Sequence, residues 1–136
     1  MNIKIEQITY QLAWQIRHEV MWPNEPLAFV QLDKDPEGLH YGLFDQNRLW
    51  FVVSVYLEDT TAQFRKFATR TERQGKGYGT ALLNYMLEDI KTFGAQRIWC
   101  NARADKLAFY EKFGMIATHE KYEKKGIQFV IMTKEL

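Results

Sequence analysis

Residues 64–93 read FRKFATRTERQGKGYGTALLNYMLEDIKTF, and this stretch decides the fold. Its glycines at alternate positions 75, 77 and 79 leave backbone N–H groups uncovered by any Cβ. Apolar and polar side chains then alternate at the helical period up to Gly94, which predicts a helix over 80–93. A glycine-rich loop that opens a helix directs unpaired N–H groups and the positive end of the helix dipole at one spot. The stretch therefore predicts a site for a phosphate group.

Two common phosphate loops are excluded by spacing. The P-loop pattern G-x-x-x-x-G-K-[ST] does not occur in the chain. The dinucleotide pattern G-x-G-x-x-G fails because Leu82 stands where the third glycine would follow Gly77 and Gly79. A glycine-rich turn without any ligand stays open as the alternative at this point.

Length and composition indicate one ordinary globular domain over residues 1–136. The net charge of +1 gives no broad basic field, so we expect neither a nucleic acid nor an anionic membrane as a partner. The single cysteine, Cys100, excludes an internal disulfide, and without clustered ligands it argues against a metal site. We find no signal peptide and no apolar run long enough to span a bilayer, and therefore expect a cytoplasmic protein.

The remaining periodicities predict alternating helices and strands in a single α/β domain. Thr9 is the expected N-cap of a helix that ends near Val20. Strands are predicted at 3–5, 39–44, 48–57, 62–69, 97–101, 115–123 and 127–136, helical turns at 27–32 and a short helix at 104–113. In the strand 62–69, Phe64 and Ala68 share one parity while Phe67 has the other, so we expect a β-bulge near Phe67 and Ala68.

Two motifs in this order of elements resemble one family. Gln74-x-x-Gly77-x-Gly79 matches the [QR]-x-x-G-x-[GA] pyrophosphate loop of the acetyl-CoA-dependent N-acetyltransferases of the GNAT superfamily. Asn101, followed by the Ala108 to Gly114 segment that contains Tyr110, resembles the N-x-x-A-x-x-x-Y-x-x-x-G-F pattern of the same family, with Met115 where phenylalanine is usual. The resemblance implies a mixed, mostly antiparallel sheet with helices on both faces.

The resemblance also implies where acetyl-CoA, the co-substrate, would bind. Its position would be a V-shaped gap between two parallel strands that diverge. The pantetheine arm would pair with the backbone of Phe67, Ala68 and Thr69 as an added strand does, and Asn101 would reach it from the other side. For Asn101, a strand-end turn former is the alternative. The pyrophosphate would lie on the backbone around Gln74, Gly75, Lys76, Gly77, Tyr78, Gly79 and Thr80.

The implied chemistry is direct transfer of the acetyl group to a primary amine. A backbone N–H near Ala68 would stabilise the negative charge on the carbonyl oxygen, and Tyr110 would protonate the leaving thiolate. The alternative for Tyr110 is a side chain that fills the helix–sheet interface with its hydroxyl bonded locally. Cys100 has no role in this scheme.

The general base and the acceptor are not assigned by the sequence. Some family members have a carboxylate base at the position of Gln63, which cannot act as one. A water chain to His40, His18 or Glu19 is the candidate replacement. A CoA-binding module without turnover is the competing function. The acceptor is expected to be a small-molecule or peptide amine, and the oligomeric state, a homodimer included, is left open.

Overall fold

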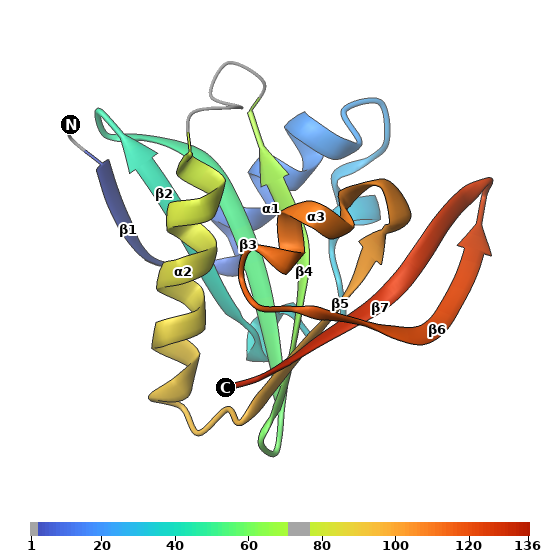
Figure 1. Ribbon diagram of the computed structural model, residues 1–136. Helices are drawn as coiled ribbons and strands as arrows, with labels where there is room; N and C mark the ends of the chain where they lie inside the picture. The colour runs from blue at the N-terminus through green and yellow to red at the C-terminus, as the bar shows by residue number, and fades with distance from the viewer. Residues whose placement is uncertain (1–2, 71–76) are drawn as a thin grey trace.

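The computed structural model describes residues 3–70 and 77–136, in which seven strands form one sheet in the order β1-β2-β3-β4-β5-β7-β6 (Figure 1). The main helices are α1 (Tyr10–Met21), α2 (Tyr78–Lys91) and the short α3 (Leu107–Glu111), with 3-10 turns η1 (Leu27–Val30), η2 (Asp35–Glu37) and η4 (Ala104–Lys106). The strands are β1 (Ile3–Ile8), β2 (Leu39–Asp45), β3 (Arg48–Glu58), β4 (Thr61–Thr69), β5 (Arg97–Arg103), β6 (Ile116–Lys124) and β7 (Ile127–Glu135).

The fold class predicted from the sequence is confirmed. Among the described strands, β4 and β5 form the one parallel pair, and all other neighbours are antiparallel. Thr9 is the N-cap of α1, since its side chain accepts a hydrogen bond from the Leu12 backbone N–H at 3.3 Å. The predicted helix 104–113 is instead a 3-10 turn followed by the five-residue α3.

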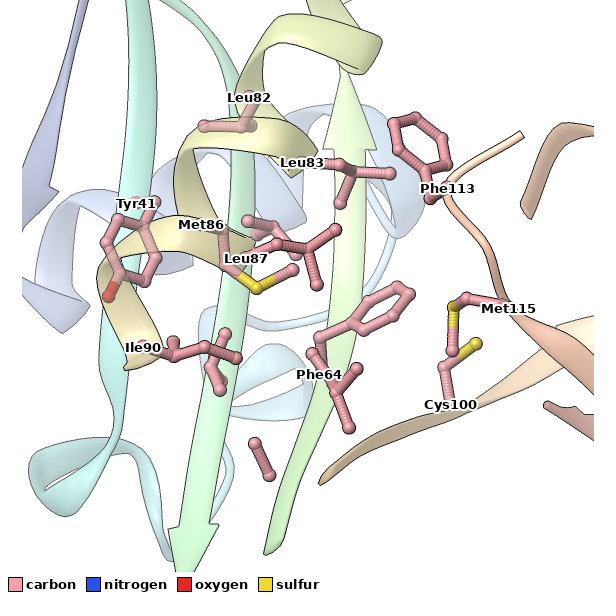
Figure 2. Packing of buried hydrophobic residues seen from close by; sticks show 14 of the residues in the cluster. Tyr41, Phe64, Leu82, Leu83, Met86, Leu87, Ile90, Cys100, Phe113 and Met115 are labelled. Atoms are coloured by element: carbon pink, nitrogen blue, oxygen red, sulfur yellow. The ribbon is translucent and has the colours of Figure 1, made fainter. Parts of the chain in front are cut away.

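The helices cover both faces of the sheet because β3 is apolar on both sides. Ile16 of α1 packs on one face in a buried cluster with Leu49, Val52 and Ala68. On the opposite face, α2 packs its buried residues, Met86 among them, in the main core with Val53. Figure 2 shows this second face, where the labelled side chains of α2 point toward the strands. A strand buried on both faces reads as a continuous apolar run, as residues 49–53 do.

β4 and β5 separate part-way along their length. Their pairing covers only Thr61–Gln63 against Arg97–Trp99, although β4 runs on to Thr69 and β5 to Arg103 (Figure 1). Beyond Gln63, the backbone edge of β4 that faces β5 therefore has no strand partner in the described residues. The V-shaped gap expected from the sequence is present.

A β-bulge interrupts β4 at the place where the gap opens. Val52 pairs with Ala68 and Ser54 pairs with Arg65, so β4 has one residue more than β3 between these pairs. The extra length falls at Lys66 and Phe67, and Lys66 has the left-handed φ of 58°. The bulge expected near Phe67 and Ala68 is thus confirmed and lies one residue closer to the start of the strand.

Candidate active site

A cleft of about 590 Å³ occupies the gap between β4 and β5. It extends from the bulge and the start of α2 on one side to α3 on the other. It is lined by Met21, Phe51, Phe64, Arg65, Lys66, Phe67, Thr69, Gly77, Gly79, Thr80, Cys100, Asn101, Arg103, Lys106, Phe109, Tyr110 and Phe129. Most of the residues predicted for a CoA site therefore line this one cleft.

The start of α2 supplies the polar backbone of the cleft. Gly77 is the N-cap with φ of 78°, a conformation that L side chains rarely adopt. Its carbonyl accepts the first helical hydrogen bond, from Ala81 N at 3.1 Å. The N–H groups of Tyr78, Gly79 and Thr80 precede that bond and have no acceptor within the helix. The first turn of α2 therefore presents donors and a positive dipole end at the cleft.

Gly79 is required for close packing at this turn. A Cβ on this residue would lie 2.9 Å from Phe67 Cζ and 3.4 Å from Phe51 Cε2. The ring of Phe67 in turn stacks on Phe109, with 6.3 Å between the ring centroids. The absence of a side chain at position 79 thus leaves room for the stacked rings of Phe67 and Phe109, which join β4 to α3.

The other predicted site residues divide into three groups. Thr69, Thr80 and Asn101 line the cleft directly, and Asn101 is exposed. Ala68 and Tyr78 can contribute only backbone, because Ala68 is buried and the Tyr78 hydroxyl donates a hydrogen bond to Asp45 Oδ2 at 2.9 Å. Gln74, Gly75 and Lys76 lie outside the described residues.

Tyr110 and Cys100 lie on the wall of the cleft formed by α3 and β5. No hydrogen bond from the Tyr110 hydroxyl occurs within the described ranges, so the alternative of a locally bonded tyrosine is not observed. Burial, and to a smaller degree the nearby Cys100, raises the pKa of Tyr110 to about 12. Burial also raises the pKa of Cys100 to about 12. Both groups are therefore protonated near neutral pH, which suits Tyr110 as a proton donor and makes Cys100 a poor nucleophile.

The charged side chains that line the described part of this cleft are all cations, and sequence reasoning missed each of them. Arg65 and Lys66 come from β4, Arg103 from the end of β5, and Lys106 from η4. Arg103 and Lys106 follow Asn101 within five positions, so their place beside that motif is the signal that could have identified them.

A second cavity of about 860 Å³ lies on the other side of β4. Its charged residues are mainly acidic: Asp33, Glu37, Glu58 and Asp59 against Lys34 and Arg65. It is also lined by Leu32, Tyr56, Leu57, Thr61, Gln63 and Trp99. Within the described residues, Arg65 is the one side chain that lines both cavities. The two cavities therefore approach each other where β4 and β5 part.

The three candidate relays for the general base are all engaged elsewhere. His40 is 3 % exposed, and its ring nitrogens bond to Ser54 Oγ at 2.7 Å and to the Asp35 carbonyl at 2.8 Å. His18 Nε2 bonds to the Glu25 carbonyl, and Glu19 forms an ion pair with Arg70 at 2.7 Å. None of the three lines either cavity in the described structure. Gln63 lines the larger cavity, at the last position of β4 that pairs with β5.

A buried polar network supports the wall of the larger cavity. Arg17 and Asp35 are both fully buried and form an ion pair at 2.7 Å. Arg17 also donates to Ser54 Oγ at 2.8 Å, while Asp35 accepts from Trp14 Nε1 at 2.7 Å and from the Leu32 backbone N–H at 2.8 Å. The network therefore joins α1, η2 and β3 beneath the segment 32–37 that lines the cavity.

The described residues lack both a membrane-spanning helix and a cluster of metal ligands. They contain no helix that is long and apolar enough to cross a membrane. Nor do they contain a cluster of three or more His, Cys, Asp or Glu side chains that could hold a metal ion.

One family model matches most of this chain. The sequence model of the family described as acetyltransferase (GNAT) domain matches residues 23–136. The uncharacterized N-acetyltransferase YitI of Bacillus subtilis (strain 168) is 24% identical over 144 residues, which cover 98% of this chain and 97% of YitI.

Solved structures share the fold along the whole chain. Escherichia coli ElaA has a TM-score of 0.82 at 20% identity, with 98% of this chain and 99% of ElaA covered. A GNAT family acetyltransferase from Elizabethkingia anophelis, solved with acetyl-CoA bound, has a TM-score of 0.77 at 19% identity, with 99% of both chains covered.

Proposed function

This chain belongs to the GNAT family of acetyl-CoA-dependent N-acetyltransferases, and we propose that it transfers the acetyl group directly to a primary amine across the opening between β4 and β5. The observation that supports this proposal most strongly is the position of Tyr110. Its protonated hydroxyl lines the same cleft as the first turn of α2 and the edge of β4 that faces β5.

The cationic cleft is the proposed site for acetyl-CoA. The first turn of α2 would hold the pyrophosphate, since its N–H groups and dipole favour an anion. Arg103 and Lys106 would attract the remaining phosphate charge. The backbone of Phe67–Thr69, on the edge of β4 that faces β5, would pair with the amide groups of the pantetheine arm. The Elizabethkingia anophelis protein, which has the same fold, is solved with acetyl-CoA bound, and this supports the assignment.

The acidic cavity is the proposed entry for the acceptor. A primary amine is a cation near neutral pH, and the four carboxylates of this cavity favour a positive charge over the anionic donor. The amine would then pass Gln63 and Arg65 to reach the cleft from the face of β4 opposite the donor. In this arrangement the acceptor is a small-molecule or peptide amine, and binding a second copy of the chain is not required.

Groups of this chain are proposed for each step of the acetyl transfer. When bound, acetyl-CoA supplies the acetyl thioester. Lys66 and Phe67 have no partner in the β3–β4 register, so a backbone N–H at the bulge is the proposed donor to the carbonyl oxygen. Tyr110 would protonate the leaving sulfur. The proton of the amine would leave through a water chain that leads to the carboxylates of the acidic cavity, because His40, His18 and Glu19 do not line it. A cytoplasmic location is part of the proposal, in keeping with a chain that has a single cysteine.

The test is release of CoA thiol from acetyl-CoA over a panel of primary amines, together with calorimetric titration of CoA. We expect binding and amine-dependent release, and Arg103→Ala and Lys106→Ala should each weaken CoA binding more at low salt than at high salt. Arg97→Ala is the matched control, because Arg97 lies on the same strand but pairs with Glu135 outside the cleft. CoA binding without release from any amine would favour the competing function, a module without turnover.

A further inference from the structure

Lys66 has a backbone conformation that sets it apart from the rest of the described chain. The other non-glycine residues with positive φ are Gln46, Asn47, Asp59 and Lys125, and all four lie in turns between consecutive strands. Lys66 lies within β4, where the pairs on either side of the bulge hold it at φ of 58°. Strained residues of this kind persist where the surrounding structure determines them and gather at functional sites.

The side chain of Lys66 is half-buried on the wall of the proposed donor cleft. Cys100, Asn101 and Tyr110 line the same cleft. No carboxylate forms an ion pair with Lys66 in residues 3–70 and 77–136. The Lys66 side chain thus lines the cleft in which the thioester would bind, and no ion pair within the described ranges holds its amine elsewhere.

The charges around Lys66 favour its neutral form. Burial is the largest cause that lowers its pKa, and the cations of Arg65, Arg17 and Lys124 lower it further, while among the described residues the Asp35 carboxylate opposes them. A neutral amine is the nucleophilic form, so a larger share of Lys66 is reactive near neutral pH than of a solvent-exposed lysine.

We propose that Lys66 is a self-acetylation site, modified in the absence of an external amine by the acetyl-CoA bound in its own cleft. The inference rests on the proposed function, because the donor must occupy this cleft. In the step, the lone pair of Nζ attacks the thioester carbonyl carbon, the new C–N bond forms and the C–S bond breaks with its electron pair on sulfur. The proton lost by nitrogen neutralises the thiolate, and the products are N-acetyllysine and free CoA. No further reactant is required.

The experiment is peptide mass spectrometry of the folded protein after timed incubation with acetyl-CoA alone. We expect one acetyl group at Lys66, gained about tenfold or more faster than at Lys125, because a held amine reacts at a high effective concentration. Lys125 is the matched reference, since it also has a positive φ but lies in the exposed β6–β7 turn. Lys66→Arg should abolish the fast component, whereas Lys125→Arg should leave it unchanged.

Two further conditions separate this inference from the function on which it rests. In the urea-unfolded chain, Lys66 and Lys125 should react at similar rates, since the cleft is lost. If the folded enzyme binds acetyl-CoA and acetylates an amine but Lys66 reacts no faster than Lys125, self-acetylation is wrong and the proposed function stands. If acetyl-CoA does not bind the cleft, as judged by calorimetry, both are wrong.

Discussion

Arg17 and Asp35 form an ion pair with 2.7 Å between Nη1 and Oδ2, and neither side chain is exposed to solvent. Burial alone would raise the pKa of Asp35, but hydrogen bonds from Arg17, Tyr56, Trp14 and the Leu32 backbone together hold it well below its ordinary value. The carboxylate is therefore charged at every pH at which the protein is expected to work. Since the pair joins α1 to the segment 32–37, it links the stability of the fold to the shape of the acidic cavity.

Asp35→Ala is expected to destabilise the protein by about 3–5 kcal/mol, because it leaves the Arg17 guanidinium buried without its counter-charge. The free energy of unfolding in urea measures this loss. The variant should also raise KM for the amine more than KM for acetyl-CoA, since the segment 32–37 lines the acceptor cavity and not the donor cleft.

The matched control is the exposed pair between Arg97 and Glu135, which has a comparable separation of 2.6 Å but side chains that are 56% and 69% exposed. Glu135→Ala should cost about 0–1 kcal/mol. Equal losses in the two variants would show that the buried pair contributes no more than a surface pair does.

The stability of the fold should fall as the pH drops below about 6.5, and His40 is the expected cause. Burial lowers the pKa of His40 below its ordinary value of 6.5, so in that range the unfolded chain binds a proton that the folded chain does not. Unfolding is then favoured as acid is added, by up to about 1.4 kcal/mol per pH unit for one proton. Urea unfolding at pH 7.5, 6.5, 5.5 and 5.0 measures the slope.

His40→Gln should flatten this slope, although it lowers stability at every pH because His40 bonds to Ser54 and to the Asp35 carbonyl. His119→Gln is the comparison, since His119 is exposed on β6. A slope that His119→Gln reduces and His40→Gln leaves intact would contradict the assignment.

The fold was predictable because its signals are local. The glycines before α2, the N-cap at Thr9 and the apolar run of β3 each specify an element from neighbouring residues alone. The bulge was also visible as a break in the alternation of β4. The sequence did not predict that Lys66 adopts the left-handed conformation. The register of β4 against β3, and not the residue type, determines which residue adopts it.

The residues of the cleft that belong to a sequence motif could be predicted. Those that come together from distant segments of the chain could not. Asn101, Tyr110, Gly77 and Gly79 follow family patterns, and they line one cleft. His40 was interpreted as a candidate relay, but its burial depends on η2 and β3, which cover both ring nitrogens. The pair of Arg17 and Asp35 joins residues 18 positions apart without any motif. The cations of the cleft likewise come from three separate elements.

Gly79→Ala should weaken CoA binding, because the new Cβ would lie 2.9 Å from Phe67 Cζ and displace that ring, which lines the cleft. We expect the Kd for CoA to rise at least about tenfold, equivalent to about 1.4 kcal/mol. Gly126→Ala is the control: its φ of 80° gives backbone strain, but a Cβ there meets nothing within 4 Å. It should lower stability and leave the Kd for CoA unchanged; a similar Kd in both variants would mean that close packing at position 79 does not shape the CoA site.

Cys100→Ala should keep amine acetylation within a few-fold of the wild-type rate. Although Cys100 lines the cleft, burial raises the pKa of its thiol to about 12, so almost no thiolate exists near neutral pH. Direct transfer does not use it. The test is steady-state turnover together with mass spectrometry of the quenched enzyme; loss of turnover with intact CoA binding, or an acetyl thioester on Cys100, would require a covalent route.

Tyr110→Phe should lower kcat by about 10²-fold or more, with little change in the Kd for CoA, because it removes the proton donor and keeps the ring that packs on Phe64. The pKa of Tyr110, about 12, keeps the hydroxyl protonated across the usual assay range, so the rate of the wild-type enzyme should not fall with rising pH until well above pH 10. A donor with a better leaving thiol provides the sharpest check: replacing acetyl-CoA with an activated acetyl aryl thioester should restore much of the lost rate, because its thiolate leaves without a proton. If Tyr110→Phe instead raises the Kd for CoA and keeps kcat, Tyr110 packs the cleft and does not act as the acid.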